Sequence, residues 1–179
     1  MDVLDRRRGL PVALSILYIG VGRALGWDVQ GLNMPGHFLI RLGQGPQAVL
    51  QDPFNDGRVL GIAEAEELLR KVSGPKAQLE PHHLKTMSTR AILVRLLNNV
   101  ATRAEAADDL DRALAMHGRM TTIAPMMTGL WWERARLERQ LGRLQDARAS
   151  LNAMLETTHD RVLSDQIRQA ITGLARSLN

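Results

Sequence analysis

The sequence predicts an α+β fold in two parts, a small core of helix and antiparallel sheet followed by an all-α region of helical repeats. Residues 34–57 contain two short apolar runs separated by a Gly/Pro-rich turn, which is the pattern of a β-hairpin. From residue 88 onward the apolar positions have helical spacing, and this region aligns with itself after a shift of about 34 residues. The two patterns do not overlap, so they predict two structural regions.

Composition limits the functions that the chain can perform. Hydrophobic residues make up 45% and charged residues 23% of the 179 residues, as in ordinary globular proteins. The net charge is only +4, the one dense basic run is Arg6-Arg7-Arg8, and aromatics are 3%. A nucleic-acid surface needs a basic face with interleaved aromatics, so we expect no nucleic-acid partner. No apolar run approaches the roughly 20 residues of a membrane span, so we expect no membrane association and a cytoplasmic location.

The chain contains no cysteine. Disulfides, thiolate metal sites and cysteine catalysis are therefore excluded. His82 and His83 are adjacent, but Glu80 is the only carboxylate near them in the sequence. Because one carboxylate and two neighbouring histidines make a poor ligand set, we expect no metal site and no cofactor.

The first element is a helix from Pro11 to about Leu25. Proline suits the first turn of a helix, and Gly26 follows the last periodic residue as a C-cap. The helical stripe consists of Leu14, Leu17, Tyr18, Val21 and Leu25. Because most other positions are apolar as well, we expect this helix to be buried.

A short strand at residues 27–32 leads into the hairpin. His37 stands where the first hairpin strand begins, and Asp52 stands where the second one ends. In an antiparallel hairpin these positions can lie side by side, so a His–carboxylate pair is expected. Two readings of the pair stay open. It can satisfy two half-buried polar groups structurally, or it can be a surviving catalytic or ligand-binding pair.

The hairpin ends in a turn at residues 52–57, and a short helix at 62–72 is broken by Ser73-Gly74-Pro75. Residues 75–87 are polar and contain two prolines, which is typical of a linker. We therefore expect a core domain at 1–74, a linker at 75–87 and a helical domain at 88–179.

The helical domain is predicted to contain two repeats and a capping helix. Its helices are expected at about 88–101, 110–121, 128–141, 144–156 and 161–177. The shift by one period superposes Leu97 on Trp131, Ala101 on Ala135, Asp108 on Gly142, Ala113 on Ala147 and Met120 on Met154. This period with paired helices resembles the tetratricopeptide repeat, most clearly over 128–158. The alternative is an ordinary antiparallel helical bundle. Such repeats imply a protein or peptide partner on their concave face.

The N-terminal part resembles the transglutaminase-like superfamily, which comprises papain-related cysteine hydrolases and acyltransferases. The resemblance rests on RRRGLPVALSILYIGVGRALG, MPGHFLIRLG and LQDPFNDGR. These segments are most similar to SirB-type proteins, a bacterial branch that joins such a core to tetratricopeptide repeats. The resemblance implies that His37 is the general base and Asp52 its orienting acid. Members of that branch carry a further helical region before the arginine run, so this chain is expected to be shortened at its start. An uncovered apolar face would then allow a homodimer.

The nucleophile that the resemblance requires is missing. The superfamily has cysteine where the helix begins, and this chain has Leu10-Pro11 there. Papain-type acyl transfer cannot run without a thiolate. Ser15, one turn further along, is a weak candidate that needs both His37 within reach and exposure to substrate. Its hydroxyl is otherwise expected to bond a carbonyl one turn back.

The sequence therefore predicts a non-catalytic regulatory or protein-interaction module, built on a degenerate core that lacks the nucleophilic cysteine. We expect a pseudoenzyme rather than an enzyme. The alternative is a hydrolase or acyltransferase that retains the His37–Asp52 pair and uses Ser15 or water as nucleophile. Substitution of His37 distinguishes the two, because only an enzyme would lose turnover.

Overall fold

The structure, a computed structural model, describes residues 11–176, so the arginine run and Leu10 lie outside the described residues. A four-stranded antiparallel sheet with its helices comes first and a purely helical region follows, which confirms the expected α+β class. The chain forms two compact units that divide between Ile92 and Leu93. No helix within the described range is long and apolar enough to cross a membrane.

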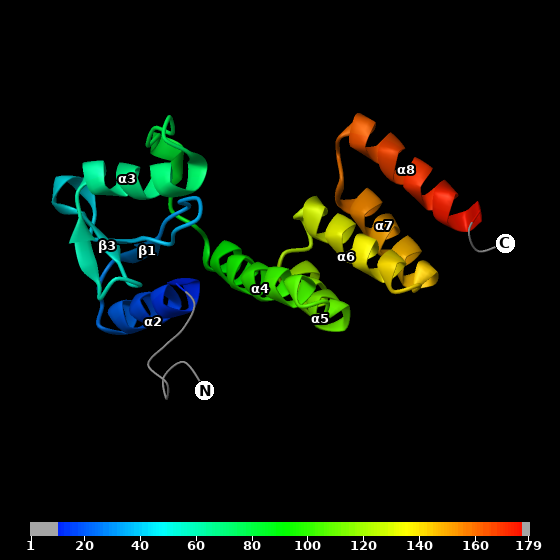
Figure 1. Cartoon of the computed structure of the whole chain (residues 1–179), viewed down its shortest axis with the longest axis horizontal. Helices are drawn as coiled ribbons and strands as arrows, with labels where there is room; N and C mark the ends of the chain where they lie inside the picture. The colour runs from blue at the N-terminus through cyan, green and yellow to red at the C-terminus, as the bar shows by residue number, and fades with distance from the viewer. Residues whose placement is uncertain (1–10, 177–179) are drawn as a thin grey trace. The chain divides into compact units, whose positions relative to one another are not determined.

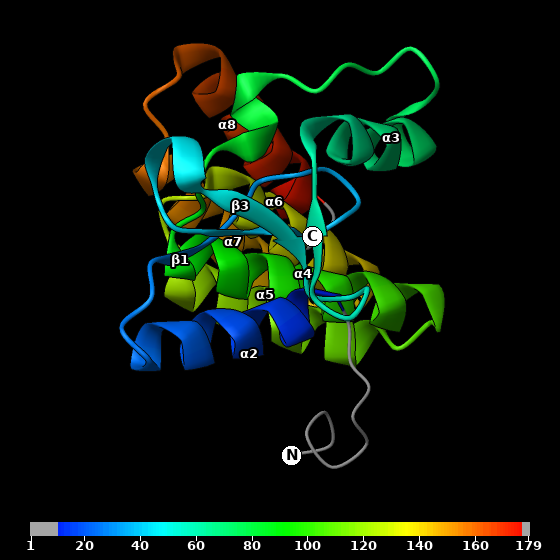
Figure 2. The same ribbon diagram turned by 90° about the vertical axis from the view of Figure 1, so that its left-hand side faces the viewer.

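The first unit is a four-stranded meander between two helices. The strand order is β1-β2-β3-β4, and each strand pairs antiparallel with the next. Figures 1 and 2 show one helix on each face of this sheet, α2 below it and α3 above it. The elements are α2 (Pro11–Ala24), β1 (Val29–Gly31), β2 (Ile40–Leu42), β3 (Val49–Asp52), β4 (Arg58–Leu60) and α3 (Ile62–Ser73).

The main core of this unit lies between the sheet and α3. Its buried members come from β4, from the segment between β1 and β2, and from α3. They are Leu32, Met34, Leu39, Leu60, Ala65 and Leu69. The segment 75–87, expected as a linker, contributes Ala77, Leu79 and Leu84 to the same cluster. It includes the short 3₁₀ helix η2 (Pro81–Leu84), and the amide of Met87 donates to the Gly31 carbonyl at 2.8 Å.

Three local expectations differ from the structure. β2 begins at Ile40, so His37 lies before the strand rather than at its start. β4 was not expected, because its two apolar residues, Val59 and Leu60, stand between a turn and a helix without a longer apolar run. The turn before β4 is closed by Asp56 and Gly57, both at positive φ. Helix α2 was expected to be buried, but it is covered on one side only.

The second unit consists of consecutive antiparallel helices. They are α4 (Thr89–Ala106), α5 (Leu110–Ile123), α6 (Thr128–Gln140), α7 (Leu144–Thr157) and α8 (Arg161–Arg176), with the first turn of α4 belonging to the first unit. The small and sulfur-containing residues that superpose from one repeat to the next are buried where the helices cross. Ala101, Ala135, Ala113, Ala147, Met120 and Met154 are all at most 5% exposed. Small residues at crossings let backbones approach, and methionines fill the space between them.

The turns between paired helices repeat as well. Asp108 and Gly142 both adopt the left-handed conformation, at φ 59° and 74°. In the first repeat the amide of Asp109 bonds the Ala104 carbonyl at 2.8 Å, and in the second Arg143 bonds the Glu138 carbonyl at the same distance. These bonds close a helix C-terminus in the same way in both repeats. The structural period therefore includes the turn, although only the second repeat has the glycine.

Substitutions in these two turns should have opposite effects on the free energy of unfolding. Gly142→Ala should lower the free energy of unfolding by about 1–2 kcal/mol, because a Cβ is disfavoured at positive φ. Asp108→Gly should raise it by up to about 1 kcal/mol, because it removes that strain from the first repeat. Urea unfolding followed by circular dichroism measures both.

Gly118→Ala is the matched control for these turns. Gly118 lies inside α5 without positive φ, and a Cβ there would meet nothing within 4 Å. Alanine should therefore stabilise this position by about 0.5–1 kcal/mol. Equal effects of Gly118→Ala and Gly142→Ala would contradict the conformational explanation.

His117 on α5 is a buried titratable group in the second unit. It is 3% exposed, and its Nδ1 has no hydrogen-bond partner among the described residues. Burial lowers the pKa of His117 below its usual value of 6.5, and Arg136 acts in the same direction, while Glu105 and Glu133 partly oppose it. The folded protein therefore favours the neutral imidazole.

A pH dependence of stability follows from this pKa. The unfolded chain protonates this histidine below about pH 6.5, whereas the folded chain resists protonation until the pH is lower. The free energy of unfolding should therefore fall as the pH drops below about 6.5. His117→Gln should remove part of that fall when both proteins are unfolded in urea across the range. Identical pH profiles for the two proteins would contradict the prediction.

Candidate functional site

His37 and Asp52 form a close pair in the first unit. His37 precedes β2, and Asp52 is the last residue of β3, so the hairpin brings together two residues 15 positions apart. The His37 Nε2 lies 2.7 Å from the Asp52 Oδ2. The carboxylate side chain is 1% exposed and the imidazole 16% exposed. The acid is therefore buried behind a histidine that solvent can still reach.

The Asp52 carboxylate is held by further donors from the turn that follows β3. Its Oδ1 accepts from the backbone amides of Phe54 and Asn55, at 3.0 and 3.3 Å. Its Oδ2 accepts from the Asn55 side-chain amide at 2.5 Å, in addition to the imidazole. All these partners are donors, which is the environment of an ionised carboxylate. The sequence did not single out Asn55, although Asp-x-x-Asn in a turn is the pattern of such local bonds.

The pair fixes which imidazole nitrogen could act as a base. Because Nε2 donates to Asp52, a neutral His37 carries its lone pair on Nδ1. Nδ1 is therefore the ring nitrogen that Asp52 does not hold. This is the arrangement of a base and its orienting acid, and it needs a nucleophile to complete it.

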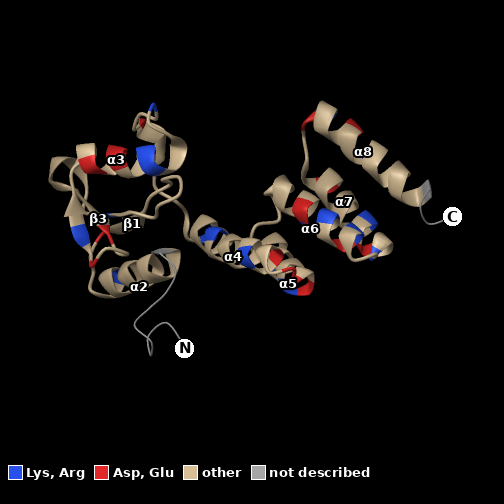
Figure 3. Ribbon diagram, viewed as in Figure 1, with Lys and Arg blue, Asp and Glu red and all other residues tan. Residues whose placement is uncertain are grey.

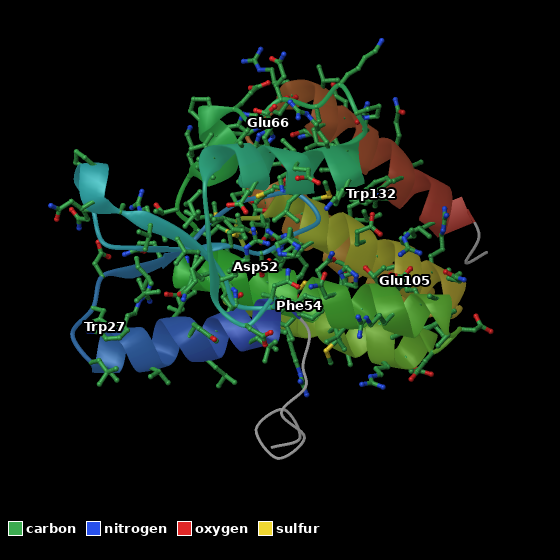
Figure 4. All side chains as sticks on the ribbon, turned by 60° about the vertical axis from the view of Figure 1, so that its left-hand side comes forward. Trp27, Asp52, Phe54, Glu66, Glu105 and Trp132 are labelled. Atoms are coloured by element: carbon green, nitrogen blue, oxygen red, sulfur yellow. The ribbon has the colours of Figure 1, made fainter. Side chains whose placement is uncertain are left out.

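The sequence indicated two positions for a nucleophile, Leu10 just before α2 and Ser15 within α2. Leu10 lies outside the described residues, so its placement is not part of the site. Ser15 lies on α2, and it is 0% exposed. A triad serine must meet its substrate, so complete burial works against that role. Figure 4 shows Asp52 and the exposed Phe54 beside the N-terminal end of α2, the helix that carries Ser15.

A second candidate site lies in the helical unit. A cavity of about 440 Å³ opens between α6 and α8, with α7 at its base. Trp132 stands at its edge and is 42% exposed, and Figure 4 shows it where α6 faces α8. The lining residues are Trp132, Ala135, Arg136, Arg139, Leu151, Ala170, Gly173 and Leu174. We call this cavity the α6–α8 groove.

The two arginines of the α6–α8 groove have different surroundings. Arg136 donates to Glu133 at 2.7 Å and to Glu105 at 2.5 Å, and these hydrogen bonds raise the pKa of its guanidinium. Arg139 is exposed, and its guanidinium makes no hydrogen bond or ion pair with the described residues. Figure 3 shows blue and red alternating along α6, and Arg139 is the groove cation that remains available to an anionic group.

Sequence reasoning did not identify the α6–α8 groove. The signal was present, because Trp132, Arg136 and Arg139 are spaced i, i+4, i+7 and so share one face of a helix. Trp131, the neighbour of Trp132, has a structural role, because its Nε1 donates to the Pro125 carbonyl at 2.8 Å.

Within the part of the chain that is described, no cluster of three or more histidine or carboxylate groups could hold a metal ion.

Two family models match the chain, one for each region. The model described as the transglutaminase-like superfamily matches residues 1–98, and the model of the tetratricopeptide repeat matches residues 100–172. The resemblance seen in the sequence is therefore confirmed for both regions. The second match also favours tetratricopeptide repeats over an ordinary helical bundle.

Curated relatives cover nearly all of the chain. A UPF0162 protein of Xylella fastidiosa is 31% identical over 177 residues, and UPF0162 protein PA3419 of Pseudomonas aeruginosa is 34% identical over 173. Each alignment covers 97% of this chain but 63% of the relative, so the chain spans under two thirds of these proteins' length. Mouse F-box only protein 21 is 37% identical over 76 residues, which is 38% of this chain and 12% of that protein. No solved structure matches the chain.

The Asp52 contacts predict a structural cost of substitution. Asp52→Asn keeps the shape but turns one acceptor oxygen into an NH₂ group that faces donors. The free energy of unfolding should fall by about 2–3 kcal/mol, because donors to a buried charged acceptor lose their partner. Urea unfolding measures this loss. Asp56→Asn is the control, since Asp56 is exposed in the same turn and asparagine tolerates its positive φ. A similar loss in both variants would contradict the prediction.

Proposed function

Because the chain belongs to the transglutaminase-like superfamily and continues into tetratricopeptide repeats, we propose that it is a non-catalytic protein-interaction module. In this proposal the first unit is a degenerate core, and the repeats bind a protein or peptide partner. The absence of cysteine carries the proposal, because the family chemistry needs a thiolate that this chain cannot supply.

The retained pair supports a structural role for the core. Asp52 accepts hydrogen bonds from the imidazole, from two backbone amides and from the Asn55 side chain. These bonds tie the end of β3 to its turn and to the segment before β2, whether or not a substrate is ever present. A buried carboxylate with so many donors stabilises the fold on its own account.

The α6–α8 groove supports the binding role of the repeats. It offers an exposed indole, an apolar floor at Leu151 and Leu174, and the available guanidinium of Arg139. Exposed tryptophan and arginine beside an apolar pocket are the residues that most often dominate binding energy at protein interfaces. A peptide with an apolar side chain and a nearby carboxylate would satisfy both kinds of contact.

The 2.7 Å contact between His37 and Asp52 favours one alternative. A hydrolase or acyltransferase could use Nδ1 of His37 to activate water or Ser15. The partial exposure of His37 allows water to reach the ring, whereas Ser15 is wholly buried. Within this alternative, water is therefore the better nucleophile.

One pair of assays distinguishes the two functions. Peptides selected on the purified full chain from a random display library should bind in the α6–α8 groove. The double variant Trp132→Ala/Arg139→Glu should weaken them by more than about tenfold, because both an aromatic anchor and an ion pair are lost. His37→Ala should leave their affinity unchanged. Fluorogenic esters and amides should show no turnover by the wild type.

The control for the groove variant is Arg119→Glu. Arg119 is an exposed arginine on α5 outside the groove lining, so it carries the same change of charge. If the two variants weakened peptide binding equally, the loss of affinity would be explained by overall charge. That result would contradict the assignment of binding to the α6–α8 groove. Turnover that disappears in His37→Ala would instead establish the enzyme alternative.

A further inference from the structure

The sheet face that carries α2 is only partly covered. Helix α2 packs closely on β1, since a Cβ at Gly22 would lie 2.5 Å from the Val29 side chain. The cover extends to β2, where Ile40 is fully buried, but it is incomplete over β3 and β4 on the same face. Leu42 pairs with Val49 and Gln51 with Val59, so these side chains point to the same side of the sheet. Val49 and Val59 are exposed there.

A hollow of about 370 Å³ lies in this incomplete layer. Its walls come from α2, from the turn that follows α2, and from β2 and β3, and they are almost entirely apolar. The lining residues are Leu17, Tyr18, Val21, Gly22, Leu25, Trp27, Ile40, Leu42 and Gln51. Val21, Leu25 and Trp27 stand at its rim and are 60%, 61% and 59% exposed. Figure 4 shows Trp27 at the C-terminal end of α2. The same face therefore presents both a hollow and protruding apolar side chains.

This face, which we call the α2 face, carries almost no charge. Arg23 is the only charged residue from Pro11 to Ala24, and Figure 3 accordingly draws α2 almost entirely in tan. Its guanidinium is held by the Val29 carbonyl and by the side chains of Gln30 and Thr89. Two copies of the α2 face could therefore meet without opposing like charges, although the whole chain has a net charge of +4.

The exposed apolar area suits an interface. Tyr18, Val21, Leu25, Trp27, Val49 and Val59 are between 38% and 61% exposed. For side chains of this size the exposed fractions correspond to roughly 500 Å². A standard interface buries about 800 Å² on each partner, of which about 60% is apolar. The α2 face therefore supplies about the apolar area that one side of a stable dimer needs.

We propose that the α2 face is a self-complementary docking surface, and that its occupant is a second copy of this chain. Around a two-fold axis, Val21 and Leu25 of each copy enter the hollow of the other, and Trp27 closes the rim. A hollow and protruding groups on one neutral face are what an isologous contact requires. The α2 face lies in the first unit and the proposed peptide groove in the second, so this dimer does not depend on the proposed function.

Sedimentation velocity of the full chain tests the dimer. The wild type should shift from monomer towards dimer between about 1 and 200 µM, as mass action requires. Val21→Glu should raise the dimer dissociation constant by about a hundredfold or more, because the contact would bury two unpaired carboxylates. Because Val21 is mostly exposed in the monomer, circular dichroism should show the variant folded.

Val162→Glu is the matched control. Val162 is 70% exposed and belongs to α8, which is in the other unit. The control therefore makes the same valine-to-glutamate substitution at a residue that is not part of the α2 face. It should dimerise as the wild type does, and Leu25→Lys should behave like Val21→Glu. A wild type that stays monomeric over the whole range overturns the proposal. So does a dimer that survives Val21→Glu, or one that Val162→Glu abolishes equally.

Discussion

The first unit depends on a buried carboxylate that must be hydrogen-bonded. Asp52 ends β3 with 1% of its side chain exposed, and water cannot solvate it there. Its donors are the His37 imidazole and, from the turn that leads to β4, two backbone amides and the Asn55 side chain. Because an unpaired buried charge would cost several kcal/mol, the hairpin, the turn and the imidazole are constrained together. The same bonds that would orient a catalytic base therefore also hold the sheet together.

The sequence predicted this pair but not all of its surroundings. Two apolar runs around a Gly/Pro turn were enough to bring His37 and Asp52 together, because hairpin geometry is local. β4 was missed because its two apolar residues, Val59 and Leu60, stand between a turn and a helix without a longer apolar run. The exposure of α2 was missed for a different reason. Its composition indicates what the helix can bury, and composition does not say whether anything covers the side that carries Val21 and Leu25.

In the helical unit, the sequence predicted the positions where the same packing requirement recurs in each repeat. Alanines at the crossings and methionines between them recur in each repeat because each crossing has the same space to fill. The left-handed turns recur too, and Asp108 shows that the backbone conformation is kept where glycine is replaced. The α6–α8 groove was harder to predict. Trp132 and Arg139 are ordinary surface residues in the sequence, and only the position of α8 turns them into the wall of a cavity.

The same contacts bear on the proposal that the first unit is a non-catalytic core. Under that proposal no thiolate acts, so a pair that served only proton transfer would be under no functional constraint. Here His37 is one of several donors to a buried acid, so losing it leaves a carboxylate short of a partner. In the proposed function, the fold would therefore retain His37 and Asp52 for the stability that the pair provides. The two surfaces proposed for binding, the α6–α8 groove and the α2 face, do not include this pair.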